Sequence, residues 1–298
     1  MAYWGKELCM ATKSNGVKCT NCAYYRINQT LLCGVHSSGK KKETRVELPH
    51  HPNEKEMKEK ERSDHVLRCD HIASMNRASS TKGTVTLYKM RMMKNVGFED
   101  GVVNVFPNFK HGGRNDGLGL PSLSPKSIGP IHHPQPDLPV ALNLENFHQG
   151  NKVFPAEVDE KGEIKQVFFD TQKDMYEDDV PHRHKEVSGG VNIPLYSLWK
   201  DKEGVTHKIS YFTSRQFYCV YYERATLDNP DYKKLMKMRD DGYHLRICGY
   251  DAYEPKGKSM EECYCDTSRP FGHELVLYTM LTESEENWPW RKYKTFDF

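Results

Sequence analysis

A cluster of cysteines near the N-terminus places the strongest constraint on how this chain can fold. The first 36 residues contain four cysteines and a histidine at Cys9, Cys19, Cys22, Cys33 and His36. Thiolates and neutral imidazoles are the ligands of tetrahedral zinc, and a short Cys-x2-His knuckle lets two ligands converge on one ion. Residues 1–38 are too few to build a sufficient hydrophobic core, so a bound metal is expected to stabilise this module.

Five candidate ligands compete for four places around the ion. The run resembles a short Cys3His module in which Cys9, Cys19, Cys33 and His36 bind Zn2+, and Cys22 is then spare. The alternative pairs Cys19 and Cys22 with Cys33 and His36 and leaves Cys9 free. Four protein ligands leave no open coordination position, so the zinc is expected to be structural. An odd number of clustered cysteines favours reduced thiols over a disulfide framework.

Composition divides the rest of the chain into a linker and one large domain. Residues 39–64 mix both charges with almost no large apolar side chains, which predicts a charged linker or an exposed helix. From 65 to 298 apolar segments recur, and 11 % of all residues are aromatic. No apolar run is long enough to span a bilayer, and the first residues lack the pattern of a signal peptide. We therefore expect a cytoplasmic protein without a membrane partner.

Local patterns in the large domain predict helices and a few strands, which indicates an α+β fold. Residues 84–93 alternate like a strand, and 243–247 do the same. A capping box starting at Thr213 predicts a helix to about 225. Asn229 before a proline predicts a second helix that stops at Gly242.

The segment LENFHQGNKV places a carboxylate, an amide and an ammonium at fixed intervals. Gln149 follows Glu145 by four residues, and Lys152 follows three residues later. This pattern resembles the central motif of the NADAR family. The chain departs from that motif at Asn146, where the family usually has His, and at His148, where it usually has an aromatic residue.

Other stretches extend the resemblance in the same order along the chain. LSPKSIGPI at 123–131 is similar to the family's opening stretch, with FPNF at 106–109 as the alternative. Residues 221–247 resemble the family's helix, Asn-Pro helix start and strand. Residues 270–281 resemble its closing helix, with Glu274 where the family has Asn.

The resemblance covers roughly 120–283 and is interrupted by an insertion near 155–210. It implies a NADAR-like, mainly helical domain with a small sheet over 65–298. NADAR proteins cleave N-glycosidic bonds, including those of riboflavin-pathway intermediates and of ADP-ribosylated guanine bases. The resemblance therefore implies a hydrolase whose partner is a ribosylated nucleotide or ADP-ribosylated nucleic acid.

Cleavage of an N-glycosidic bond passes through an oxocarbenium-like state, which a carboxylate stabilises while an acid protonates the departing base. Glu145 is the predicted carboxylate, and Lys152 and Glu274 complete the predicted catalytic set. Glu223 and Asp251 compete with Glu274 for the second acid or base. The predicted substrate-binding residues are Lys126, Phe147, Gln149, Arg269, Gly272 and His273. Of these, Gly272 and His273 offer backbone N–H groups at a helix start, which suits a phosphate.

Two other functions are compatible with the sequence. A non-enzymatic structural or binding protein of a large DNA virus or phage could keep the fold with an altered pocket. The N-terminal module could also contact nucleic acid or a virion protein through basic residues, which are Lys13, Lys18, Arg26 and Lys40–Lys42. The motif PHRH at 181–184 follows the acidic YEDD at 176–179 and is interpreted as a solvated charged loop.

Overall fold

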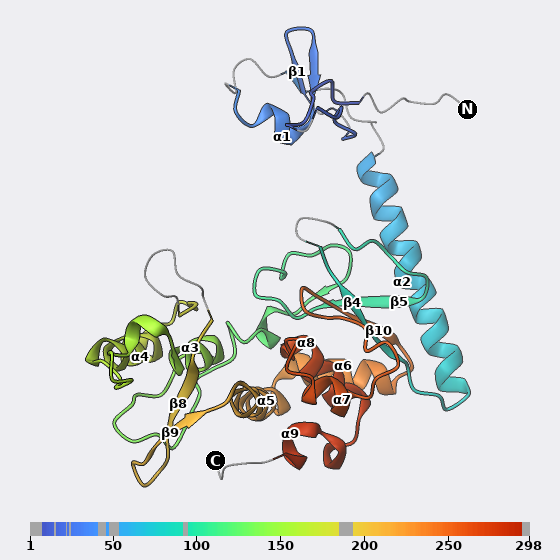
Figure 1. Cartoon of the computed structure of the whole chain (residues 1–298). Coiled ribbons are helices and arrows are strands. Elements are labelled where there is room, and N and C mark those ends of the chain that lie inside the picture. The colour runs from blue at the N-terminus through green and yellow to red at the C-terminus, as the bar shows by residue number, and fades with distance from the viewer. Residues whose placement is uncertain are drawn as a thin grey trace. The chain divides into compact units, whose positions relative to one another are not determined.

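The computed structural model describes residues 8–14, 16–21, 23, 25–40, 46–47, 54–91, 95–184 and 193–293. The chain divides into two compact units, Met1–Asp64 and His65–Phe298 (Figure 1). The predicted linker over 39–64 is in part helical, because α2 (Glu54–Ala78) begins inside it. Residues 41–45 and 48–53 of that linker lie outside the described part.

The first unit has a small antiparallel sheet with the order β2 (Thr30–Leu32), β1 (Tyr25–Ile27) and β3 (Val46–Glu47). Asn28 has φ +55° between β1 and β2, a left-handed conformation that asparagine tolerates in tight hairpin turns. A single turn of helix, α1 (Gly34–Ser37), follows β2 directly. Apart from cysteines, Leu32 is the one large side chain in this unit's buried cluster among the described residues. The described part of this unit therefore has very little apolar core.

The second unit is built around a parallel sheet. Its four strands have the order β4 (Val85–Lys89), β10 (His244–Gly249), β5 (Val102–Phe106) and β6 (Leu118–Gly119). The strand predicted at 243–247 is confirmed as β10, and that predicted at 84–93 is confirmed over 85–89 as β4, with residues 92 and 93 outside the described part. Their pairing was not predicted, because β10 enters between β4 and β5 from a part of the chain about 140 residues away.

One face of this sheet supports the main core. Leu245 and Ile247 of β10 are fully buried, and their neighbours on that face are Leu87 and Val105. Helix α8 (His273–Thr282) packs on β4 and β10, and α5 (Tyr211–Leu227) packs on α8 (Figure 1). Around them lie α6 (Pro230–Asp240), α7 (Met260–Cys265), α9 (Pro289–Lys292) and the 3-10 turns η2 (Pro121–Leu123) and η4 (Glu285–Asn287).

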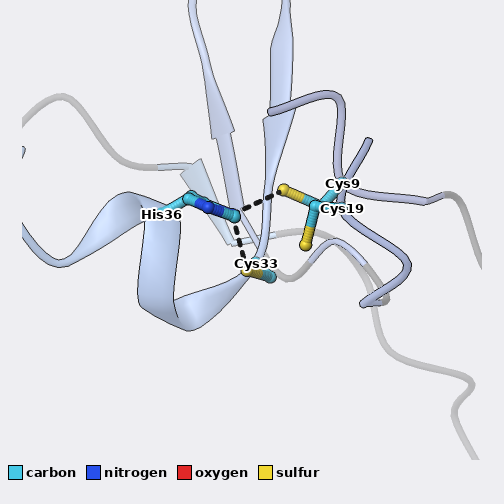
Figure 2. Close-up of side chains that lie close together, drawn as sticks. All are labelled: Cys9, Cys19, Cys33 and His36. Carbon is cyan, nitrogen blue, oxygen red and sulfur yellow. Dashed lines mark hydrogen bonds between the residues drawn. The ribbon is translucent and has the colours of Figure 1, made fainter. Parts of the chain in front are cut away.

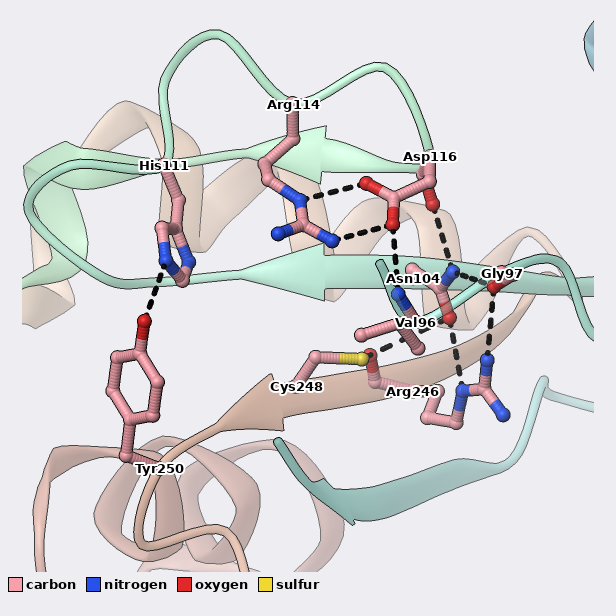
Figure 3. A network of polar contacts seen from close by, with 9 residues as sticks. All are labelled: Val96, Gly97, Asn104, His111, Arg114, Asp116, Arg246, Cys248 and Tyr250. Atoms are coloured by element: carbon pink, nitrogen blue, oxygen red, sulfur yellow. Dashed lines mark hydrogen bonds and ion pairs between the residues drawn. The ribbon is translucent and has the colours of Figure 1, made fainter. Parts of the chain in front are cut away.

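The opposite face of the sheet carries a buried polar network (Figure 3). Arg246 Nε donates to Asn104 Oδ1 (2.9 Å), and Asn104 Nδ2 donates to the carbonyls of Gly97 and Asp116 at 2.8 and 2.7 Å. Burial would raise the pKa of the Asp116 carboxyl, but hydrogen bonds led by that from Arg114 hold it below its ordinary value. The network fastens residues 95–117 over the sheet.

The insertion predicted near 155–210 packs with α3 and β7, which precede it in the chain. Helix α3 (Leu144–Gly150) packs against α4 (Gln166–Glu177), with the 3-10 turn η3 (Pro155–Glu157) between them in the sequence. Strands β7 (Lys152–Val153), β8 (Tyr196–Lys200) and β9 (Thr206–Ile209) form an antiparallel sheet in that order. Helices and sheets together give the α+β class that the sequence predicts.

Helix boundaries match the sequence with one correction. Asn229 caps α6 by accepting from the Asp231 N–H, and Gly242 follows the helix with φ +91°, as predicted. The capping box proposed at Thr213 is wrong. Ser210 is the N-cap of α5, and its hydroxyl accepts from the Thr213 N–H at 3.1 Å. The helix therefore begins before Thr213, because Ser210, the residue directly after Ile209, already caps its first amides.

Candidate active site and metal centre

Three thiols and one imidazole meet in the first unit (Figure 2). One ligand atom from each of Cys9, Cys19, Cys33 and His36 lies within 4.8 Å of all the others. His36 Nδ1 is 3.3 Å from both Cys9 Sγ and Cys33 Sγ. Tetrahedral zinc with Zn–S bonds of about 2.3 Å holds sulfur atoms roughly 3.8 Å apart, so the spacing fits such an ion. The group can hold a metal ion.

Local backbone structure brings these four residues together. Cys19 N donates to Ala11 O at 2.8 Å, which places the first two cysteines on adjoining segments. Cys33 precedes α1, and one helical turn later His36 points back toward it. Cys9 belongs to this group, as the first of the two predicted ligand sets requires. The second set, in which Cys22 replaces Cys9, leaves Cys9 free. Cys22, the other candidate ligand, lies outside the described residues.

The protonation of Cys33 also fits a metal ligand. Desolvation by burial would raise its pKa, but hydrogen bonds from the His36 backbone N–H and the Asn21 side chain, among others, lower it to about 6. The thiolate is the form of cysteine that binds zinc, so these hydrogen bonds favour the form of Cys33 that can act as a ligand.

A cleft of about 510 Å³ opens in the second unit beyond the carboxyl ends of the parallel strands. Residues 108–111, which follow β5, and residues 250–251, which follow β10, line it. Ligands of open parallel sheets bind in this position, because the loops that leave the strands converge there. Its volume is in the range of small-molecule sites.

Helix α3 and the start of β7 supply one wall of the cleft. Glu145, Gln149 and Lys152 all line it, and they form a hydrogen-bonded chain. Gln149 Nε2 donates to Glu145 Oε1 at 3.1 Å, and Lys152 Nζ donates to Gln149 Oε1 at 3.1 Å. The spacing of four residues places Glu145 and Gln149 on one helix face. Asn143 fixes the start of the helix, because its side chain accepts from the Asn146 N–H.

The start of helix α8 supplies the facing groups. Gly272, His273 and Glu274 line the cleft, and Glu274 is 2 % exposed. His273 Nδ1 lies 3.2 Å from Glu274 Oε2, and its Nε2 lies 3.2 Å from the Pro107 carbonyl. The Glu274 side chain packs over Gly249, the last residue of β10, where a Cβ atom would lie 2.2 Å from Glu274 Oε1.

Replacing Gly249 with alanine is expected to displace Glu274. The added methyl group would overlap the Cγ and carboxylate of a buried side chain, and overpacking of this kind costs about 1–3 kcal/mol. We expect a lower melting temperature and loss of the Glu274 position, read by thermal unfolding and by ligand binding. Gly113→Ala is the matched control, because nothing lies within 4 Å of its Cβ position. Equal stability of the two variants would contradict the close contact.

Tyr218 connects the two walls. Burial raises its pKa well above the ordinary value, and the charge of Glu145, followed by those of Tyr222 and Glu274, adds to this. His148 packs edge-on to the Tyr218 ring, and burial followed by repulsion from Lys152 holds the pKa of His148 well below its ordinary value. The cleft lining therefore combines the His148 and Tyr218 rings with the carboxylates of Glu145 and Glu274.

Two further predicted residues reach the cleft. Lys126 lines it and is exposed, and it follows η2 in the stretch that resembles the family's opening. Asp251 lines the cleft at its rim, and burial followed by the charge of Glu274 raises the pKa of the Asp251 carboxyl. Asn108 and Phe109, from the alternative opening stretch, are also in the lining. Residues of both stretches that resemble the family's opening, 106–109 and 123–131, therefore line the cleft.

Three candidates do not line the cleft. Phe147 is 1 % exposed and packs on Tyr221 in the core, because a residue two positions after Glu145 points to another side of the helix. The Arg269 guanidinium lies over the Tyr253 ring instead. Glu223 accepts hydrogen bonds from Trp290 Nε1 (2.6 Å) and from Arg291, so this carboxylate has a structural role.

Sequence reasoning missed several groups of the lining. They are Lys110, His111, Arg183, Tyr211, Arg215, Tyr218 and Tyr250. His111 Nε2 lies 3.3 Å from the Tyr250 hydroxyl, and this pair joins the loops after β5 and β10 (Figure 3). Once two strands are known to be parallel neighbours, the residues after each strand become candidates. The strand pairing itself carries no local signal.

The solvated loop expected at 181–184 is confirmed for His182 and Arg183, which are exposed in a segment without helix or strand, but not for His184. His184 is 7 % exposed, and its Nε2 lies 2.6 Å from Glu157 Oε1. In the described part of the chain, the Cys3His group is the one cluster of potential metal ligands, so these histidines form no second metal site. Arg183 extends from this segment into the cleft lining.

Comparisons with known proteins identify no relative of this chain. No protein-family model, no curated protein and no solved structure matches this chain. Among the described helices, none has both the length and the apolar character needed to cross a membrane.

Proposed function

We propose that the second unit hydrolyses N-glycosidic bonds of a ribosylated base or an ADP-ribosylated nucleic acid. The observation that supports this most is convergence. Glu145, Gln149 and Lys152 share one cleft with the Gly272–Glu274 helix start, although about 120 residues separate the two sets. The resemblance of the α3 segment to the NADAR motif points to the same chemistry.

The two carboxylates provide a physical basis for the reaction. The bond between C1′ of the ribose and the base nitrogen breaks, water adds to C1′, and the base nitrogen takes up a proton. A carboxylate beside C1′ stabilises the positive charge that develops as this bond lengthens. Glu145 is proposed for that role, because it is only partly buried and Gln149 orients its Oε1. Glu274 is proposed to orient the water from the opposite wall.

Lys152 is proposed to protonate the departing base. Burial lowers its pKa to about 8, with repulsion from Arg183 adding to the effect and attraction to Glu145 opposing it. An acid whose pKa lies near the working pH is efficient, because it is protonated at rest and gives up its proton readily. An ordinary surface lysine would hold its proton too tightly.

The direct test is incubation of the full chain with ADP-ribosylated DNA and with ribosylated pyrimidine intermediates. Released base and released sugar are separated by chromatography and identified by mass spectrometry. Hydrolysis of either substrate supports the proposal. Binding of these ligands without any cleavage would instead support the non-enzymatic alternative, in which the fold retains an altered pocket.

The pH dependence gives a separate prediction. The proposed donor is the protonated form of Lys152, so kcat/KM should fall as pH rises through about 8, approaching tenfold per pH unit. Lys152→Arg keeps its charge across this range and should lose the alkaline limb, at a lower maximum rate. A pH–rate profile of both proteins is the measurement. An alkaline limb that persists in Lys152→Arg would assign that titration to another group.

For the first unit, we propose that the bound metal is structural zinc. Three sulfur ligands and one imidazole nitrogen are the donor set of closed zinc sites, and four protein ligands leave no place for a substrate. The ion would stabilise a unit whose apolar core is too small to fold alone.

A further inference from the structure

The segment at 181–184 holds one exposed cation between two buried attachment points. His182 and His184 flank Arg183 on either side. The His182 backbone and the His184 ring are both held by hydrogen bonds from neighbouring elements. Arg183 is exposed and lines the cleft. An arginine fixed in this way loses less conformational freedom on binding a ligand than one on a free loop.

The first attachment point is Asn146, which is fully buried in α3. Its Nδ2 donates to the carbonyls of Asp178 and Val180, each at 2.9 Å, and its Oδ1 accepts from the His182 N–H at 2.7 Å. One amide side chain thus satisfies three backbone groups of the neighbouring segment. No histidine could do this, because an imidazole cannot donate twice and accept once at these positions.

The second attachment point is His184. Its Nε2 lies 2.6 Å from Glu157 Oε1, and its Nδ1 lies 3.3 Å from the Gln149 carbonyl. Its ring also packs edge-on to Phe154. The contact with Gln149 ties this segment to the end of the helix that carries Glu145 and Gln149.

Among the residues that the structure describes, none pairs with the charge of Arg183. Its guanidinium makes no hydrogen bond or ion pair with any residue in the described ranges. It lines the same cleft as Lys152, and its positive charge adds to the lowering of the Lys152 pKa and opposes the rise in the Asp251 pKa. Two cations held close together repel each other, and an anion bound between them removes that repulsion.

The charge of the whole cleft agrees with an anionic ligand. Its lining has five lysines and arginines, which are Lys110, Lys126, Lys152, Arg183 and Arg215, against three carboxylates. Arg215 is 3 % exposed, and within the described chain its guanidinium donates only to backbone carbonyls. The cleft therefore carries a surplus of positive charge.

We propose that Arg183 is a specificity-determining residue, which binds a phosphate of a phosphorylated ribosyl ligand at the rim of the cleft beside Lys152. The ribosyl identity rests on the function proposed above, whereas the phosphate contact rests on the geometry of this segment alone. A guanidinium matches phosphate oxygens with two parallel hydrogen bonds, which gives both affinity and orientation. Residues 181–184 belong to the insertion predicted near 155–210, so only chains with this insertion would make the Arg183–phosphate contact.

Calorimetric titration of the full chain tests this. The probes are ADP-ribose and ribose 5-phosphate, with adenosine and ribose as counterparts that lack phosphate. Arg183→Gln is expected to weaken binding of the phosphorylated probes roughly 10- to 100-fold, because a charge-assisted hydrogen bond is lost. Arg183→Lys should recover part of that loss. Arg224→Gln, an exposed change of equal charge on α5, should bind as the wild type does.

A double-mutant cycle tests the attachment point. If Asn146 acts by positioning Arg183, then Asn146→Ser and Arg183→Gln together should weaken the phosphorylated probes no more than Arg183→Gln alone. A purely structural role for Asn146 would instead give additive losses, and would overturn that part of the proposal.

Two results would overturn the phosphate contact itself. One is unchanged affinity of Arg183→Gln for both phosphorylated probes, and the other is failure of the wild type to bind either of them. The outcome is separable from that of the hydrolysis assay. Arg183-dependent binding without cleavage would sustain this proposal and reject the hydrolase, whereas cleavage that does not depend on Arg183 would do the reverse.

Discussion

Replacing Glu145 with glutamine is expected to lower kcat/KM roughly 10²- to 10⁴-fold while the protein stays folded, as is typical when a catalytic charge is removed. The glutamine has the same shape, and its carbonyl oxygen can still accept from Gln149 Nε2. What it lacks is the negative charge opposite the developing oxocarbenium ion. The measurement is steady-state hydrolysis together with thermal unfolding.

A matched control separates this effect from a general change in charge. Glu160 is an exposed carboxylate in a turn outside the cleft, so Glu160→Gln should keep full activity. If Glu145→Gln retained wild-type kcat/KM, the proposed role of Glu145 would be rejected. If it lost activity together with its thermal transition, a structural role would be indicated.

Removal of the metal is expected to unfold the first unit. Structural zinc supplies about 10 kcal/mol or more of folding free energy in small modules of this kind, and here the described apolar core has a single large side chain. Atomic emission should find one zinc ion per chain in the wild type. It should find none in Cys19→Ser. Hydrogen exchange should then show loss of protection over β1, β2 and α1.

The second unit serves as an internal reference in that experiment. Every described residue of the cleft lies in His65–Phe298, so titration with ADP-ribose should give the same dissociation constant with and without the metal. Cys265→Ser alters an exposed cysteine outside the cluster and should leave the zinc content unchanged. A wild-type protein without bound metal, or a folded first unit in Cys19→Ser, would contradict the structural role.

The predictions that succeeded from sequence were those with local causes. Helix periodicity places Glu145 and Gln149 on one face of α3. The pair Asn229-Pro230 predicts the start of α6. The same periodicity could have excluded Phe147, since a residue two positions from Glu145 faces elsewhere on the helix. A stricter use of helical geometry would therefore have corrected one of the proposed substrate contacts.

The features that sequence could not supply depend on distant pairings. Nothing in the composition of β10 indicates that it enters between β4 and β5, and this placement brings Tyr250 and Asp251 to the cleft. The burial of His184, in a loop that is otherwise solvated as expected, has a similar cause. The charge of the loop suggests solvation, but His184 is buried because Glu157 and Gln149 from other elements satisfy its ring.

The division of the chain into two units has an evolutionary consequence. The cleft draws on segments from Asn108 to Glu274, so a gene fragment that encodes only part of that span would give no site on which selection could act. The Cys3His unit is different, because its four grouped residues fit within 28 consecutive positions of the chain. Gain, loss or exchange of that unit can occur as a single genetic event that leaves the residues of the cleft unchanged. We therefore expect related lineages to differ in it more readily than in the cleft.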